Sequence, residues 1–422
     1  MASLTHRARS GAHHNGLRAG VWAAVSVLAA GASATLGAPG DIHNLNTPDG
    51  GESTANAVNA SGQVTGWAGG HAFRYFGAPG SGVMQDLGTL GGLGSSGGAI
   101  NDAGDVAGGS AMHPDSNTHA FRYVGTPGSG GVMQDLGTLG GSHSAAFGIN
   151  TAGHVVGRSD LADGITPRAF LYVGTPSSGG VMHDLGTFGG SDSIALGIND
   201  AGQITGFAYR ADSTARAYRY VGTPGSGGVM QDLGTLGGPS SSGQAINASG
   251  QVAGDSTITA DLAIAHAFRH SGTPGGGGVM EDLGTLVEGG RSAAYAINNA
   301  GHVAGAGSSS ADVDHAFLYT GAPGSGGTMY DLDAWLDATN PAEGAKWTLN
   351  IANGLNDAGL VVGNGEYDDG PGGLTDGTRA FLLDASSLVP EPSSAALIGL
   401  GGLALLRRRF GGGRDTHGPE AI

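Results

Sequence analysis

The sequence contains no cysteine. Disulfide bonds, thiol nucleophiles and cysteine-ligated zinc or iron–sulfur sites are therefore excluded. Charged residues are scarce, at 13% of the chain, and basic residues are scarcer than acidic ones, 18 against 35. The formal net charge of −17 argues against nucleic acid as a partner and favours cations, basic surfaces or neutral polymers.

Glycine, in contrast, is abundant. It supplies 85 of the 422 residues, well above the usual share of roughly 7%. The glycines do not fall on every third position, which excludes a collagen helix. Their number favours a turn-rich architecture in which glycines separate short ordered segments.

The first 34 residues have the pattern of a secretory signal peptide. The opening 18 residues contain arginines and histidines but no acid, and an apolar stretch, "AGVWAAVSVLAAGASA", follows. This stretch ends on the small residues Ala32, Ser33 and Ala34, which form an A-x-A cleavage site. We predict a signal peptide over 1–34 that is cleaved near Ala34, with a buried N-terminal helix as the alternative.

The C-terminal segment predicts a short membrane helix. Pro390 and Pro392 precede the 14 apolar residues from Ser393 to Leu406. A helix of that length, rising about 1.5 Å per residue, covers about 21 Å of a bilayer core roughly 30 Å thick. The basic cluster that follows would stay on the cytoplasmic side, and it comprises Arg407, Arg408 and Arg409. We therefore predict a linker over 385–392, a transmembrane sorting helix over 393–410 and a disordered tail over 411–422.

The motif Val389-Pro390-Glu391-Pro392, the apolar run and the arginine cluster together resemble the PEP-CTERM sorting signal of Gram-negative bacteria that make exopolysaccharide. The resemblance implies recognition by an exosortase, cleavage near Pro-Glu-Pro, and delivery to the outer surface or the extracellular matrix. The chain departs from the usual pattern by continuing past the arginines with "GGGRDTHGPEAI".

Between these two ends, three phrases recur seven times in fixed order, about 49 residues apart. The aspartate of "DLGTLGG" and its two degenerate copies is Asp41, Asp86, Asp135, Asp184, Asp232, Asp282 and Asp331. The asparagine of A-I-N-x-A-G-x-V-x-G is Asn59, Asn101, Asn150, Asn199, Asn247, Asn298 and Asn356. The aromatic residue of His/Arg-Ala-Phe/Tyr is Phe73, Phe121, Phe170, Tyr218, Phe268, Phe317 and Phe381.

Each repeat predicts two β-hairpins. The β-rich runs "AFRYVG" and "VMQDLGTL" are separated by the turn sequence "TPGSGG". The segments "GIN" and "QITG" flank a second turn, in which Asn199 can form an Asx-turn and Gly202 can adopt positive φ. No helical periodicity occurs in this stretch. Four strands in about 49 residues predict an all-β, seven-bladed β-propeller over 41–384, with a β-solenoid as the alternative.

The phase of the repeats predicts how the ring closes. The chain enters at Asp41, inside a hairpin, and leaves at Arg379–Leu383, the strand that would precede it. We expect these two segments to pair antiparallel.

The phrase "HAFRYVGTPGSGGVMQDLGTLGG" followed by "GINDAGQITG" also resembles the HAF family of extracellular repeats, which implies an extracellular location and leaves the role open.

Catalytic motifs are weak. "GLGSSG" at 92–97 matches a dinucleotide pattern and Ser96 a nucleophile elbow, but neither has the strand-to-helix context that it requires. The histidine of "HAF" and the aspartate of "DLG" are residue types that could form a ring of catalytic or metal-binding sites. Arginine, however, replaces the histidine in three repeats, at Arg168, Arg216 and Arg379. Arginine is neither a ligand nor a base, so we predict structural pairs. "NDAGD" from Asn101 is interpreted as a plain turn because the twelve-residue calcium-loop spacing is missing.

The loop before "HAF" is acidic in repeats two to seven. Its acids are Asp115, Asp160, Asp163, Asp212, Asp255, Asp261, Asp312, Asp314, Glu366, Asp368, Asp369 and Asp376. Equivalent loops lie on one face of a propeller, which predicts an acidic ring interrupted at repeat one. These acids are either solvated loop residues or a surface that captures cations or glycans, with Trp67 and Tyr209 as sugar platforms. We expect no cofactor, with Ca²⁺ as the alternative.

These features together predict an exported, envelope-sorted protein that acts as a non-catalytic binding or structural component of the cell surface or exopolysaccharide matrix. Its expected partners are an exosortase-type enzyme, the membrane before processing, and polysaccharide, but not nucleic acid. The alternative is a secreted glycan-active enzyme, because propellers can hold carboxylate pairs around their axis. Catalysis would require a few unrepeated polar residues in one pocket.

Overall fold

The computed structural model describes residues 37–389 apart from short segments at 46–50, 78–80, 113–116, 126–130, 261–263, 273–277, 311–312, 323, 372 and 375. The predicted signal peptide with Ala32 and Ala34 lies outside the described residues. The sorting segment from Pro390 onward also lies outside them, with Glu391, Pro392, Arg407, Arg408 and Arg409. Among the helices of the described part, none is long and apolar enough to cross a membrane.

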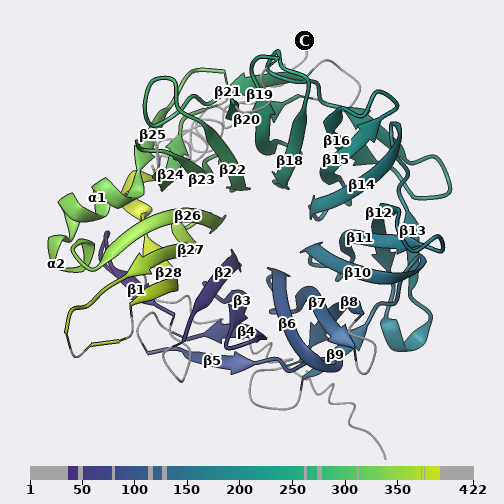
Figure 1. Ribbon diagram of the computed structural model, residues 1–422, viewed down its shortest axis with the longest axis horizontal. Coiled ribbons are helices and arrows are strands. Elements are labelled where there is room, and N and C mark those ends of the chain that lie inside the picture. The colour runs from purple at the N-terminus through teal and green to yellow at the C-terminus, as the bar shows by residue number, and fades with distance from the viewer. Residues whose placement is uncertain are drawn as a thin grey trace, which may run out of the picture.

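Seven four-stranded antiparallel sheets surround a central axis (Figure 1). This confirms the predicted seven-bladed β-propeller and excludes the β-solenoid. Blade 1 contains β2 (Ser53–Val58), β3 (Val64–Ala68), β4 (His71–Phe76) and β5 (Val83–Asp86). Blade 2 contains β6 (Gly91–Ile100), β7 (Val106–Met112), β8 (Thr118–Val124) and β9 (Val132–Asp135). Blade 3 contains β10 (Gly140–Ile149), β11 (Val155–Leu161), β12 (Pro167–Val173) and β13 (Val181–Asp184), with η1 (Pro176–Ser178) before β13.

The remaining blades repeat this order from the axis outward. Blade 4 contains β14 (Gly189–Ile198), β15 (Ile204–Arg210), β16 (Ala215–Val221) and β17 (Val229–Asp232). Blade 5 contains β18 (Ser241–Ile246), β19 (Val252–Thr257), β20 (Ala265–Ser271) and β21 (Val279–Asp282). Blade 6 contains β22 (Ser292–Ile297), β23 (Val303–Ser308), β24 (Asp314–Thr320) and β25 (Thr328–Asp331).

Blade 7 joins the two ends of the chain. It contains β26 (Trp347–Leu355), β27 (Leu360–Tyr367) and β28 (Gly377–Asp384), and its outer strand is β1 (Ile42–Asn44). The strands β1 and β28 pair antiparallel with Ile42 opposite Leu383 and Asn44 opposite Phe381. The predicted closure is therefore confirmed.

Local sequence explains the hairpins nearest the axis. The Asn199 side-chain oxygen accepts the backbone N–H of Gln203 at 2.9 Å, and Gly202 has φ +75°. The repeated glycine of x-V-x-G is a steric requirement, because a Cβ at Gly206 would lie 2.0 Å from the carbonyl oxygen of Ile194 on the inner strand. The predicted positive φ of Gly202 is confirmed. The predicted Asx-turn bond, to the N–H two residues on, is present in other blades, as between Asn101 and the Ala103 N–H at 3.1 Å, whereas Asn199 accepts the N–H four residues on.

The core lies between neighbouring blades rather than within one sheet. In one cluster, Ala72 and Leu87 of blade 1 pack against Val106, Phe121 and Tyr123 of blade 2. The aromatic residue of the "HAF" phrase is almost fully buried in every blade. A single blade cannot bury this surface alone, so the repeats are stable only as a stack of neighbours.

The last repeat corrects two predictions. Its "DLDAWLDAT" segment forms α1 (Leu332–Thr339), and α2 (Pro341–Gly344) follows, although we predicted no helix. The glycines of "GTLGG" are absent here, and Asp331 caps α1 by accepting the N–H groups of Asp333 and Ala334. The segment from 385 that we predicted as linker includes η2 (Ser386–Leu388) and packs on blade 7, with Ala385 and Val389 in the apolar core.

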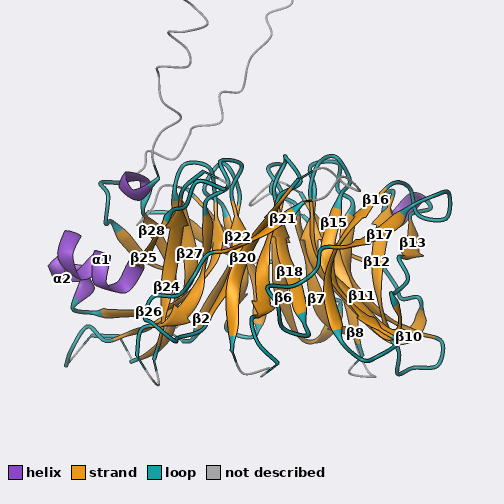
Figure 2. Cartoon of the chain, turned by 90° about the horizontal axis from the view of Figure 1, so that it is seen from above, coloured by secondary structure: helices purple, strands orange, loops and turns teal. Residues whose placement is uncertain are grey.

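The strands run between two distinct faces (Figure 2). Because neighbouring strands alternate in direction, the seven turns that begin at the repeated asparagines and the TPGSGG turns share one face, here called the asparagine face. The "DLG" segments that cross to the next blade and the acidic loops share the opposite, crossover face. The described ends of the chain lie side by side at the asparagine face, where the Gly40 N–H donates to the Asp384 carbonyl at 2.9 Å.

Candidate functional site

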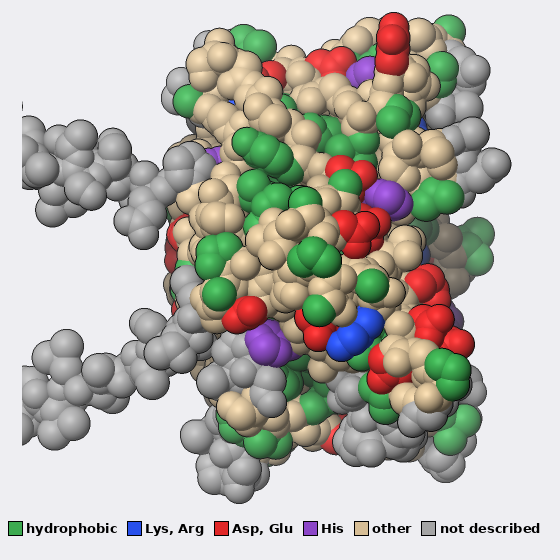
Figure 3. Space-filling model, turned by 90° about the vertical axis from the view of Figure 1, so that its left-hand side faces the viewer, with side chains coloured by type: hydrophobic (Ala, Val, Ile, Leu, Met, Phe, Trp, Pro, Cys, Tyr) green, Lys and Arg blue, Asp and Glu red, His purple; other side chains and the backbone are tan. Residues whose placement is uncertain are grey.

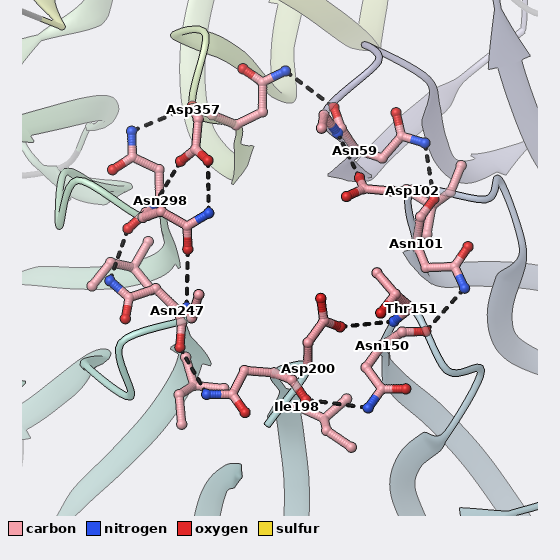
Figure 4. Close-up of a pocket in the computed structure, with 18 of the residues that line it drawn as sticks. Asn59, Asn101, Asp102, Asn150, Thr151, Ile198, Asp200, Asn247, Asn298 and Asp357 are labelled. Atoms are coloured by element: carbon pink, nitrogen blue, oxygen red, sulfur yellow. Dashed lines mark hydrogen bonds between the residues drawn. The ribbon is translucent and has the colours of Figure 1, made fainter. Parts of the chain in front are cut away.

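The seven repeated asparagines form a closed ring of hydrogen bonds around the axis (Figure 4). In every blade the Asn Nδ2 donates to the backbone carbonyl of the equivalent asparagine in the next blade, at 2.9 to 3.4 Å. The ring includes the bond from Asn356 of blade 7 to Asn59 of blade 1, at 3.1 Å. These side chains are buried and committed to structure, so they are not available to a ligand.

Inside this ring lies a small cavity of about 250 Å³. Its inner wall is the aliphatic residue that precedes each asparagine, such as Ile100 and Ile149. At its rim, the carboxylates of Asp102 and Asp200 accept backbone N–H groups of Ala60 and Thr151 from the preceding blades, at 3.0 and 2.9 Å. These rim acids therefore also connect blades.

In six blades the histidine or arginine of the "HAF" phrase pairs with the aspartate of "DLG", as predicted. In blade 7 the residue opposite the aromatic Phe381 is Asn44 rather than the predicted Asp41, whereas in blade 1 the residue opposite Phe73 is Asp86. The histidine Nδ1 lies 2.8 to 2.9 Å from the carboxylate in four blades, where the pairs are His71–Asp86, His119–Asp135, His266–Asp282 and His315–Asp331. In two further blades an arginine Nε lies 3.8 and 3.9 Å from it, in Arg168–Asp184 and Arg216–Asp232. These pairs join the third and fourth strands of a blade, counted from the axis, at the crossover face.

The predicted acidic ring is not a single site in the described residues. Asp115, Asp261 and Asp312 lie outside them. Four further acids belong to strands rather than loops, namely Asp160 in β11, Asp255 in β19, Asp314 in β24 and Glu366 in β27. Within the described ranges, no three Asp, Glu or His side chains gather into a group that could hold a metal ion. On the side shown in Figure 3, acidic side chains are scattered among neutral ones.

Most of the described loop acids serve their own turns. Hydrogen bonds from the hydroxyl of Thr166 and two backbone N–H groups lower the pKa of Asp163, and the Thr214 hydroxyl does the same for Asp212. Asp368 accepts the Gly370 N–H at 2.8 Å, and Asp369 is an exposed neighbour. These contacts match the interpretation of solvated loop acids.

The two proposed sugar platforms are also separate. Trp67 lies in β3 of blade 1, whereas Tyr209 lies in β15 of blade 4 and packs edge-on against Phe207, with ring centroids 6.1 Å apart. Blades 1 and 4 stand on different sides of the ring in Figure 1. One ligand therefore cannot stack on both rings at a single site.

A different set of residues converges in the central channel. Each inner strand has a β-bulge three residues before its asparagine, where the pairing register with the second strand shifts. The residues at these bulges are Asn56, Gly98, Phe147, Leu196, Gln244, Tyr295 and Asn353. All seven line one cavity of about 490 Å³. A bulge re-aims its side chain, and here we call these residues the bulge ring.

The bulge ring differs from blade to blade, unlike the phrases on either side of it. Its polar members come from the consecutive blades 5, 6, 7 and 1, and they are Gln244, Tyr295, Asn353 and Asn56. Blades 3 and 4 contribute Phe147 and Leu196, and blade 2 contributes Gly98, which has no side chain. The channel therefore has a polar arc that faces an apolar arc, with an opening at blade 2.

The polar arc presents hydrogen-bond acceptors. Asn56 Nδ2 donates to the Gly97 carbonyl at 2.8 Å, and Asn353 Nδ2 donates to the Ala55 carbonyl at 2.9 Å. Gln244 Nε2 donates to the Ser242 hydroxyl at 3.2 Å. Each of these bonds fixes the orientation of its amide. The three side-chain oxygens have no partner within the described residues and remain free to accept ligand hydroxyls.

A buried carboxyl stands behind this arc. Asp255 Oδ1 lies 3.4 Å from Gln244 Nε2, and burial raises the pKa of Asp255 while this hydrogen bond opposes the shift. Burial also raises the pKa of Tyr295 in the next blade, with the nearby charges of Asp255 and Asp314 adding to the effect. Among the described residues, Asp255 is thus the one predicted acid whose carboxylate lies within hydrogen-bond distance of a channel side chain.

Sequence reasoning missed the bulge ring because it followed acids and repeated residues. The usable signal was a variable residue between two small ones, as in Ala146-Phe147-Gly148 and Ala294-Tyr295-Ala296. Small neighbours leave room for a bulge, and variation within a repeated phrase marks a position that the fold does not determine.

Comparison with known proteins gives a fold neighbour only. No family model matches the chain, and no curated protein matches it. Among solved structures, it is similar to TolB from Acinetobacter baumannii, at 12% sequence identity and a TM-score of 0.41, over 68% of this chain and 67% of that chain.

Proposed function

We propose that this protein is exported and serves as a non-catalytic binding component of the cell surface or the exopolysaccharide matrix, with the central channel as its binding site for a neutral glycan. The observation that carries the proposal is the bulge ring, in which amides of blades 1, 5 and 7 and aromatic rings of blades 3 and 6 meet in one cavity. Such mixed polar and aromatic linings suit polyhydroxylated ligands, which have hydroxyl edges and apolar C–H faces.

The lining also supports binding over hydrolysis. It contains Asn, Gln, Tyr, Phe, Leu and small residues, with no Asp, Glu, His, Lys or Arg among the described residues of the cavity wall. Glycoside hydrolysis requires two carboxyl groups on either side of the bond. A cavity without them can hold a sugar but lacks the acid and the base.

The sorting signal gives the proposed protein an orientation. Val389 packs in the core at the asparagine face and directly precedes Pro390. An anchor or a cleavage site at Pro-Glu-Pro therefore adjoins that face. The crossover face, toward which the channel cavity extends through Ser96 and Thr118, would then point away from the membrane.

A secreted glycan-active enzyme is the alternative, and Asp255 is the observation that favours it. A buried carboxyl with a raised pKa beside a channel has the property that a general acid needs. This alternative requires a second carboxyl within reach, for which the described cavity wall has no candidate.

The proposal is tested with the full chain on a panel of neutral and acidic glycans, with and without Ca²⁺, beside a hydrolysis screen. We expect binding of neutral glycans, no dependence on Ca²⁺ and no products. Turnover that is lost in Asp255→Asn would favour the enzyme.

For the sorting signal, mass spectrometry of the protein from native envelopes should find a C-terminus near Pro390–Pro392, and an intact end at Ile422 would contradict it.

A further inference from the structure

The channel has a side crevice between blades 2 and 3. The position after the repeated x-V-x-G glycine lies on the second strand, opposite the inner strand, and its occupants are Trp67, Gly109, Arg158, Phe207, Asp255, Ala306 and Asn364. In blade 7 this side chain reaches the next blade, since Asn364 Oδ1 accepts the Ala55 N–H at 2.9 Å. In blade 2 it is absent, because the residue is Gly109.

The missing side chain leaves open space that belongs to the channel cavity. Ser96, Gly109, Thr118 and Ala145 line the same 490 Å³ cavity as the bulge ring. A Cβ at Gly109 would lie 3.6 Å from the Ala145 Cβ and 3.3 Å from the Thr118 methyl carbon, so a single methyl group there would already touch both walls of the crevice. Blade 2 is also the blade whose bulge residue, Gly98, has no side chain, so the crevice opens directly onto the channel.

The walls of the crevice combine small apolar groups with free hydroxyls. The Ala145 methyl and the Thr118 methyl give apolar contact, while the hydroxyls of Ser96 and Thr118 have no hydrogen-bond partner within the described residues. No charged side chain lines it among those residues. A group that fits must be small, uncharged, part methyl and part hydrogen-bond acceptor, and an acetyl group has these properties.

We propose that the channel is specific for an acetylated neutral sugar, whose acetyl group occupies the crevice between blades 2 and 3. The sugar's hydroxyls then face the polar arc of Gln244, Asn353 and Asn56, and its C–H face lies against Phe147. This inference rests on the proposed function, since it assigns the ligand class of the same site. Acetamido and O-acetyl sugars share the chemistry, and the experiment separates them.

The test compares ligand pairs that differ only in the acetyl group. Calorimetric titration of the full chain would use the β-1,4 tetramers of N-acetylglucosamine and of glucose, and glucomannan oligosaccharides before and after removal of their O-acetyl groups. We expect the acetylated member of at least one pair to bind at least tenfold more tightly. The pair that shows the preference identifies the linkage of the acetyl group.

The repeats themselves supply the variants. Gly109→Phe copies Phe207 of blade 4 at the equivalent position and fills the crevice. It should remove the preference, so that the two members of a pair bind with affinities within twofold of each other. Gly109→Ala, which places a single methyl group in contact with Ala145, should give an intermediate preference if the larger variant fails to fold. Phe147→Ala, at the shared wall, should weaken both ligands of a pair.

The outcomes separate the inference from the function on which it rests. Equal affinity for both members of each pair, or a preference retained in Gly109→Phe, overturns the acetyl assignment and leaves glycan binding in place. Failure of the wild-type chain to bind any neutral glycan overturns both. A wild-type preference for the acetylated ligand that is lost in Gly109→Phe, while both ligands still bind, supports both.

Discussion

Asn356→Ala and Asn101→Ala form a matched pair that tests whether the propeller is closed. Each asparagine is buried, donates from Nδ2 to the next blade and accepts two backbone N–H groups of its own turn. The bond of Asn101 joins blades 2 and 3, which are neighbours along the chain. The bond of Asn356 joins blade 7 to blade 1, which come from opposite ends of the chain and meet where the ring closes by the pairing of β1 with β28.

The expected cost is the same for both variants. Each loses three hydrogen bonds worth about 1 kcal/mol net apiece, so the free energy of unfolding should fall by about 3 kcal/mol. Asp102→Ala is the control, since its exposed carboxylate makes one hydrogen bond, to the Ala60 N–H, and its loss should cost about 0.5 kcal/mol.

Urea unfolding followed by circular dichroism measures the three variants against the wild type. Closure predicts that Asn356→Ala and Asn101→Ala agree within about 0.5 kcal/mol, the usual spread of such contributions. If blades 7 and 1 were apart in solution, Asn356→Ala would lose only its two turn hydrogen bonds, and its cost would fall about 1 kcal/mol below that of Asn101→Ala. That result would show that the ring described here is wrong.

Two further predictions concern the buried basic residues His270 and Arg219. His270 replaces the tyrosine found at this position in five blades, and burial, aided by Arg219, lowers its pKa from 6.5 to about 4. The unfolded chain therefore binds this proton at a higher pH than the folded chain, so the free energy of unfolding falls by about 2–3 kcal/mol as the pH drops from 6.5 to 4. Urea unfolding at pH 7 and 4.5 should show that His270→Tyr lacks this part of the decline. An equal decline in both proteins would refute the assignment. Arg219 is 2% exposed and donates to the carbonyls of Gly250 and Gly272, with no carboxylate partner among the described residues. Blades 3 and 6 have Leu171 and Leu318 at the equivalent position. Arg219→Leu should therefore destabilise at least about 1.5 kcal/mol less than Arg219→Ala, which leaves a cavity, and equal losses in thermal and urea unfolding would show that the two carbonyl contacts dominate.

The fold could be predicted from the sequence because the repeated residues each have a local physical role. Asn199 and Gly202 specify a turn, the "TPGSGG" segments specify another, and Gly206 is required by a close backbone approach. Seven such units with a hairpin split between the chain ends leave few topologies other than a closed ring. These residues act within about one repeat of each other, which is the range over which sequence patterns are informative.

The helices and the candidate site could not be predicted in the same way. The segment "DLDAWLDAT" is too short for a clear helical period, and its helix depends on burial of Leu332 and Leu336 against blade 7. The acidic residues were conspicuous in sequence, but Asp163 and Asp212 make contacts only within their own turns. The bulge ring was inconspicuous because its members share neither residue type nor charge.

The polar arc shows why a site of this kind escapes a search along the chain. Asn353 Nδ2 donates to the Ala55 carbonyl across 298 positions of sequence, and Asn56 follows Ala55 in the same bulge. The two amides become neighbours only when β1 pairs with β28 and blade 7 meets blade 1. Closure and the acceptor wall of the channel are therefore one structural event, and any change that opens the ring removes the polar arc before it disturbs the apolar arc of blades 3 and 4.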